Sequence, residues 1–215
     1  MSLRIASLVL GGLVLGVVWL GPLPALAPRA FWAHMTMHMA VVAVAAPLLA
    51  WGSSGGRADP VRRAPAWFPV IVLSLVELIA VWAWHAPALH RLARGSTLGL
   101  IAEQGTFLLA GWLVWVAALG GDPAQRMQRA AQSVTALLLT SMHMTLLGAL
   151  IALTPRPLYA SAGAVELCGA GGLDDLHLGG AIMLLIGGAV YLAGGLGITA
   201  SVLRARRSAW MGGVS

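Results

Sequence analysis

The sequence contains no lysine, a single cysteine and few charged side chains of either sign. Charged residues make up 9% of the 215 residues, whereas a soluble domain carries roughly 25%. A soluble fold of this length would therefore have too little polar surface to face water. The single cysteine, Cys168, excludes an intrachain disulfide framework, and we expect it to be an unreactive loop thiol.

Long apolar stretches take the place of the missing charge, and 59% of the residues are hydrophobic. A membrane-spanning helix needs ~20 mostly apolar residues, and glycine, proline and arginine mark the gaps between such stretches. We predict an all-α integral membrane protein, a bundle of about six transmembrane helices in which residues 1–215 form one transmembrane domain. The predicted spans are residues 5–25, 30–51, 67–86, 97–119, 131–153 and 178–203.

The first of these segments allows a second interpretation. Arg4, an apolar run and the Ala-x-Ala sequence at residues 25–27 resemble a signal peptide with its cleavage site. The apolar run of residues 5–20 is slightly long for a signal peptide, and Pro28 is unfavourable directly after a cleavage site. We therefore expect this segment to remain as a transmembrane helix.

Arginine is unevenly divided between the two ends of the predicted helices. The end that holds both termini carries Arg4, Arg57, Arg62, Arg63, Arg126, Arg129, Arg204, Arg206 and Arg207, and the other end carries Arg29, Arg91, Arg94 and Arg156. Because positive charge collects in cytoplasmic loops, we expect both termini to be cytoplasmic. The arginines form no basic stripe, so we expect membrane lipid around the protein and no nucleic acid partner.

The histidines all fall toward the opposite, outer ends of the helices. They are His34, His38, His85, His90, His143 and His177. His143 is the deepest, about ten residues or ~15 Å from the outer end of the fifth helix. This asymmetry is the strongest functional indication in the sequence, and it places the predicted site toward the outer face of the membrane.

The densest cluster is the run of residues 34–39, His-Met-Thr-Met-His-Met. His34 and His38 share one helix face, as do Met35 and Met39. Thioether sulfur beside imidazole is a donor set that suits Cu(I), and residues 142–144 repeat it as Met-His-Met. The candidate metal ligands are His34, Met35, Met37, His38, Met39, His85, Met142, His143, Met144 and His177.

Three acidic residues join these candidates: Glu77 and Glu103 inside predicted helices, and Asp175 just before the last one, which His177 opens. Ionisable groups in apolar spans are costly and therefore candidates for function. A carboxylate can also orient a ligating imidazole through its free ring nitrogen. Ordinary roles remain open, because methionine fills apolar cores and Glu77 can pair with an arginine or a tryptophan N–H. We interpret His90, a single histidine at a helix end, as an interfacial polar residue.

Five short motifs follow one another in an order that resembles a known family, the CtaG-type multi-spanning cytochrome c oxidase assembly factors. They lie at residues 34–52, 84–87, 103–115, 157–159 and 175–183, so the similarity runs from about residue 31 to about 190. The chain departs from the family pattern at Gln104 and Leu100, where the family has histidines, and at Leu176 and His177, where it commonly has Gln-Gln.

The resemblance implies a non-catalytic assembly factor that delivers copper to a haem–copper oxidase subunit. No P-loop, G-x-S-x-G or H-E-x-x-H motif indicates an enzyme. Two alternatives stay open. His38 facing His143 or His85 would ligate a haem in a redox protein. The glycine pairs of the last helix would suit a scaffold that packs on an oxidase without any metal.

Overall fold

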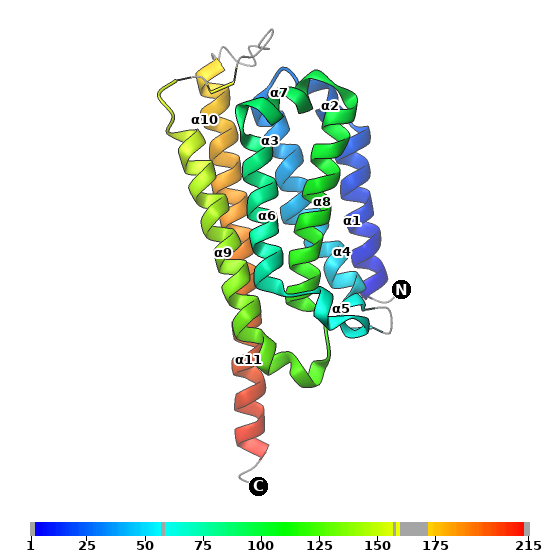
Figure 1. Ribbon diagram of the computed structural model, residues 1–215. Coiled ribbons are helices and arrows are strands. Elements are labelled where there is room, and N and C mark those ends of the chain that lie inside the picture. Colours follow the sequence, from blue (N-terminus) through cyan, green and yellow to red (C-terminus); the bar gives the residue numbers. More distant parts are fainter. Residues whose placement is uncertain (1–2, 57–58, 157, 160–171, 213–215) are drawn as a thin grey trace.

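A computed structural model describes residues 3–56, 59–156, 158–159 and 172–212, and these form helices joined by short turns (Figure 1). Cys168, Arg57 and Pro157, which enter the sequence-based predictions, lie outside the described residues. Within the described residues, six helical segments are long and apolar enough to cross a membrane, which confirms the predicted all-α membrane bundle. They are Leu3–Leu26, Phe31–Ser53, Pro65–His85, Thr97–Leu119, Pro123–Ala152 and Gly172–Ser208.

Several of the spans consist of more than one helical element. The first contains α1 (Leu3–Leu20) and α2 (Leu23–Leu26), and the second contains α3 (Phe31–Met39), the π-helical η1 (Ala40–Ala45) and α4 (Ala46–Ser53). The third joins η2 (Pro65–Trp67) to α6 (Val70–His85), the fourth is α8 (Thr97–Leu119), and the fifth joins η3 (Pro123–Gln125) to α9 (Arg126–Ala152). The sixth contains α10 (Gly172–Ile182), the π-helical η4 (Met183–Gly187) and α11 (Gly188–Gly212), while α5 (Pro60–Arg63) and α7 (Pro87–Gly95) lie between spans.

The last two spans begin earlier than predicted. The fifth starts at Pro123 and not at 131, because Asp122 accepts a hydrogen bond from the N–H of Ala124 at 3.0 Å and so caps the helix start. The sixth starts at Gly172 and not at 178, so Asp175 and His177 lie within α10 and not ahead of it. Hydropathy marks the apolar part of a helix, and a helix continues beyond that part where its polar end is capped.

The second and fourth spans form the interior of the bundle. About half of each is buried, 56% and 50% respectively, against 17% of the first span. α4 packs between α1 and α8, α6 packs on α8 and α9, and α3 packs on α10 (Figure 1). Most side chains of α3, those of His34 and His38 included, are therefore enclosed by neighbouring helices and do not face lipid.

Pro47 gives a physical reason for the π-helical turn η1. A proline has no N–H to donate to the carbonyl four residues earlier, and its ring crowds that carbonyl. The chain widens over Ala40–Ala45, where the N–H of Ala46 bonds to the carbonyl of Val41, five residues back. The carbonyl of Val42 then accepts a hydrogen bond from the Tyr191 hydroxyl of α11 at 3.4 Å.

Glycines let α9 and the sixth span approach each other closely. A Cβ on Gly148 would lie 2.6 Å from the backbone nitrogen of Leu184 and 2.9 Å from the carbonyl oxygen of Gly180. Gly194 is likewise packed against the Trp115 ring of α8. These small-residue faces are thus occupied inside the chain, in the close packing that glycine allows between membrane helices.

Candidate metal centre

α2 and α7 lie at the same end of the bundle (Figure 1). Polar side chains from α7 and from the helices that surround it gather inside the bundle. They are His34 and His38 of α3, His85 of α6, His90 and Arg94 of α7, and Glu103 of α8. The four histidines and Glu103 are each no more than 6% exposed. The structure therefore brings together four histidines that are up to 56 residues apart in the sequence, from three different helices.

α3 is held at its first turn by a side chain from α10. The Asp175 carboxylate accepts hydrogen bonds from the backbone N–H of Phe31 at 2.7 Å and of Trp32 at 2.9 Å. These N–H groups have no partner within their own helix, and a negative charge at a helix N-terminus is favourable. Asp175 therefore fixes the start of α3 and, three residues later, the position of His34; its described bonds go to backbone and not to an imidazole.

α7 carries two more polar side chains to the same place. It begins with Pro87, which suits the first position of a helix, and its buried residues are His90 and Ala93. Because His90 and Arg94 are four residues apart, they lie on the same face of this helix. The interpretation of His90 as an interfacial residue is wrong: α7 turns its histidine into the bundle, where it is 6% exposed.

His90 is a neutral imidazole in this environment. Burial, followed by the positive charge of Arg94 and the neighbouring His85, lowers the pKa of His90 to about 3. A neutral imidazole keeps one nitrogen lone pair, which is the form that binds metal ions. Nδ1 of His90 has no hydrogen-bond partner among the described residues.

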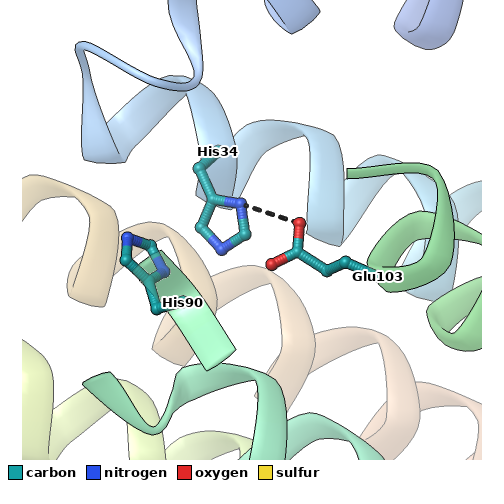
Figure 2. A group of neighbouring side chains, drawn as sticks. All are labelled: His34, His90 and Glu103. Atoms are coloured by element: carbon teal, nitrogen blue, oxygen red, sulfur yellow. Dashed lines mark ion pairs between the residues drawn. The ribbon is translucent and has the colours of Figure 1, made fainter. Parts of the chain in front are cut away.

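His34, His90 and Glu103 form a group that could hold a metal ion (Figure 2). Nδ1 of His34 lies 3.6 Å from Oε2 of Glu103, and one donor atom from each of the three residues lies within 4.8 Å of the others. Tetrahedral ligands at 2.0–2.2 Å from an ion are about 3.4 Å apart. The three donors would therefore have to approach one another by about an ångström to share an ion.

The Arg94 side chain is paired with one carboxylate oxygen of Glu103. Its guanidinium forms an ion pair with Oε2, and the amide of Gln104 reaches the same oxygen at 3.4 Å. Oε1 of Glu103 has no hydrogen-bond partner in the described part of the chain. A cation that binds Glu103 would meet the positive charge of Arg94 and would compete with it for the carboxylate.

The remaining two histidines of the cluster lie next to His34. The ring centroid of His85 is 5.9 Å from that of His34 and 5.3 Å from that of His38. Nδ1 of His85 is hydrogen-bonded to the carbonyl of Val81 at 2.6 Å, a bond in which the nitrogen must donate. Nε2 of His85 and both nitrogens of His38 have no hydrogen-bond partner within the described residues. Leaving a buried polar atom without a hydrogen bond costs about 1–3 kcal/mol. The presence of these unpaired nitrogens therefore needs an explanation other than packing.

His143 and Glu77 lie deeper in the bundle. His143 of α9 is 2% exposed, its two nitrogens have no partner among described residues, and it is close enough to His38 to interact with it electrostatically. Glu77 of α6 is fully buried, and it accepts hydrogen bonds from the hydroxyls of Tyr191 and, at 3.3 Å, Thr140. Glu77 is thus paired with hydroxyl groups from α9 and α11.

The methionines of α3 face other neighbours than the histidines do. Met35 packs against Gly179 of α10, and the sulfur of Met39 lies near Gly187 and Met144. Met37 lines a cavity of about 460 Å³ with Trp19, Leu100 and Gln104, where the family pattern has histidines at the last two positions. Met142 is 61% exposed. The helix therefore presents its imidazoles to α6, α7 and α8. It presents the thioethers of Met35 and Met39 to the sixth span and that of Met37 to the cavity between α1 and α8.

The His177 side chain is hydrogen-bonded away from the cluster of His34, His38, His85 and His90. Its Nε2 is hydrogen-bonded to the backbone carbonyl of Thr154 at 2.9 Å, which ties α10 to the end of α9. This bond connects the last two spans, and the described contacts do not place His177 beside His34 or His90.

Tyr159 and Arg94 belong to the site although the sequence did not single them out as site residues. The Tyr159 ring stacks on His90 with centroids 4.0 Å apart, and its hydroxyl donates to the carbonyl of His85 at 2.7 Å. Burial, and then the charge of Glu103, raises the pKa of Tyr159 to about 12. The available signals were the spacing of His90 and Arg94 after Pro87, which marks an amphipathic turn, and the place of Tyr159 in a family motif.

A pocket of about 400 Å³ opens beside these residues. Phe31, His90, Arg94 and Tyr159 line its inner part, and Arg29 and Arg91 also contribute to its wall. Through this pocket, an ion could reach His90 from the end of the bundle.

The chain was compared with known proteins. A family model described as "cytochrome c oxidase caa3 assembly factor" matches residues 1–205. No curated protein and no solved structure shows a significant match.

Proposed function

The chain belongs to the cytochrome c oxidase caa3 assembly factor family, and we propose that it assists assembly by binding copper and passing it to an oxidase subunit. This role involves ligand exchange at an ion and no chemical conversion, so the protein is not an enzyme. The observation that carries the proposal is the buried group of His34, His90 and Glu103. The two imidazoles are suitable donors for copper, and the carboxylate would balance part of the charge of the ion.

Arg94 makes the exchange reversible. Without an ion, the guanidinium neutralises the buried Glu103 carboxylate through their ion pair. An ion that binds Glu103 neutralises the carboxylate in place of Arg94. The Arg94 side chain is then free to turn into the pocket that it already lines. When the ion leaves, Arg94 returns to the carboxylate. Neither state then contains an unpaired buried charge, which keeps the energy difference between the loaded and empty forms small.

The pocket end of the bundle would face the periplasm of a bacterial inner membrane, with both termini in the cytoplasm and lipid around the spans. The start of α1 and the end of α11 lie at the same end of the bundle, opposite α7 (Figure 1). Most of the arginines are at that end, as expected for a cytoplasmic side. The oxidase subunit would then approach over the pocket beside His90.

The two alternatives have less support from the geometry. The His38 ring centroid is 3.9 Å from that of Phe107 and 5.3 Å from that of His85, so no porphyrin fits between these rings. The glycines of the last span that would suit a metal-free scaffold pack against Ala152, Met144 and Trp115 of the same chain. A bare ion fits the cluster better than a haem does.

The test is copper analysis of the reduced, detergent-purified protein under anaerobic conditions, together with its absorbance spectrum. Wild type should bind copper, and the double variant His34→Ala, His38→Ala should lose it. His177→Ala is the matched control and should retain it, because this histidine is bonded to Thr154. In cells, the double variant should leave the oxidase without copper. Unchanged copper content in the double variant, or a Soret band in wild type, would contradict the proposal.

A further inference from the structure

We propose that His38 and His85 form a second, inner ion position, selective for a monovalent soft ion, Cu(I), which it receives from the outer group of His34, His90 and Glu103. This inference rests on the proposed function, because it names the ion and the path inside the same cluster. The inner position lies between α3 and α6.

The state of the two inner rings is the first argument. His85 donates from Nδ1 to the Val81 carbonyl, so its Nε2 carries the lone pair and faces no partner in the described structure. A metal-ligating histidine is commonly oriented in this way through its other nitrogen. His38 is fully buried, and the described residues offer neither of its nitrogens a hydrogen bond. An N–H directed at the Phe107 ring would account for one nitrogen of His38 and leave the lone pair of the other unused.

The spacing of the rings is the second argument. The centroids of His38 and His85 are 5.3 Å apart, which allows one ion between a nitrogen of each ring. Toward the pocket, the next ring after His85 is that of His34, with centroids 5.9 Å apart. The ring of His90 follows, with its centroid 5.2 Å from that of His34. The four imidazoles therefore form a continuous series from the pocket wall into the bundle. An ion can move along it by exchanging one imidazole nitrogen for the next.

Charge distinguishes the two positions. The outer group contains a carboxylate, so it can balance part of the charge of a divalent ion. The inner pair offers neutral donors only, inside a fully buried site. The cost of placing an ion in a medium of low polarity is large and rises with the square of its charge. A monovalent ion is therefore favoured at the inner position, and imidazole is a suitable donor for copper.

The transfer is a ligand exchange without a redox step. Copper enters as Cu(I) and remains Cu(I); a bond to Nε2 of His85 forms as the bond to His34 breaks. No proton is released, because the accepting nitrogen already carries a lone pair. Arg94 returns to Glu103 as the ion leaves the outer group.

The experiment compares ion stoichiometry on the full chain in detergent, with Ag(I) as a redox-inert probe, Cu(I) against a colorimetric chelator, and Zn(II). Wild type should bind about two Ag(I) or Cu(I) but about one Zn(II) per chain. His38→Gln and His85→Gln, as independent inner variants, should each lose one monovalent ion and keep the zinc. His90→Gln should lose the zinc and keep one monovalent ion. His177→Gln is the control, and each variant is first checked for a monodisperse, cooperatively unfolding protein.

The outcomes separate this inference from the proposed function. One monovalent ion in wild type, lost in His90→Gln and unaffected by both inner variants, would overturn the inner position and leave the copper-binding proposal standing. Two zinc ions per chain would overturn the selectivity for monovalent ions. Sulfur ligands in the X-ray absorption spectrum of Cu(I)-loaded His90→Gln would overturn the imidazole pair. No copper on wild type at all would overturn the proposed function and this inference together.

Discussion

At the scale of single residues, the contact that decides the behaviour of the site is the ion pair of Arg94 and Glu103. The same carboxylate oxygen lies 3.6 Å from the imidazole of His34, so the guanidinium and an arriving ion use the same group. If the site binds an ion as proposed, Arg94 would stabilise the ion-free protein and oppose the ion-bound one.

Replacing Arg94 tests this opposition. Arg94→Gln leaves the buried carboxylate unpaired, and breaking such a pair costs about 3–5 kcal/mol. We expect the metal-free variant to unfold at a lower temperature, and metal to raise its melting temperature more than that of wild type. The measurement is thermal unfolding in detergent with and without Cu(I) or Zn(II).

Arg156→Gln provides the control, because Arg156 is exposed and does not line the pocket beside His90. This variant should behave like wild type in both conditions. A weaker effect of metal on Arg94→Gln than on wild type would show that Arg94 supports ion binding and does not compete with it.

At the scale of elements, the position of α3 depends on α10 through the Asp175 carboxylate. Asp175→Ala removes the acceptor of two backbone N–H groups at the start of α3. Loss of a helix cap costs about 0.5–2 kcal/mol. Because His34 lies in the first turn of that helix, we expect metal affinity to fall together with stability, and both are read from unfolding and competition titrations.

Two further substitutions separate capping from general charge effects. Asp174→Ala changes an exposed neighbour in the same turn and should leave both quantities near wild type. Asp175→Asn keeps one acceptor oxygen and should restore part of the affinity. If Asp175→Ala lowered stability without changing metal affinity, α3 would be positioned by its other contacts.

At the scale of the whole molecule, the cluster lies at one end of the bundle and the helix ends that carry the termini lie at the other (Figure 1). With the arginine-rich end in the cytoplasm, a fluorescent protein fused to the C-terminus should fluoresce, and alkaline phosphatase fused there should be inactive. An active phosphatase fusion would reverse the orientation and would place the pocket beside His90 on the cytoplasmic side.

The six spans could be predicted from the sequence because lipid requires long uninterrupted apolar helices, and composition alone reveals them. The start of α10 could not be predicted in this way, because its first turn contains polar residues. The carboxylate of one of them, Asp175, caps the start of α3. The role of His90 could not be predicted either. The spacing of His90 and Arg94 after Pro87 indicates an amphipathic turn, but it does not say that the face with His90 packs against the end of the bundle.

The sequence by itself determined that the described part of the chain holds six helices able to cross a membrane, that the histidines favour one end, and that His34 and His38 share a helix face. Only the tertiary structure decided which neighbours that face meets. It directs the imidazoles toward His85, His90 and Glu103 and the thioethers of Met35 and Met39 toward the sixth span. The physical reason is that helical periodicity specifies directions around one helix, whereas close packing between helices specifies what lies in each direction.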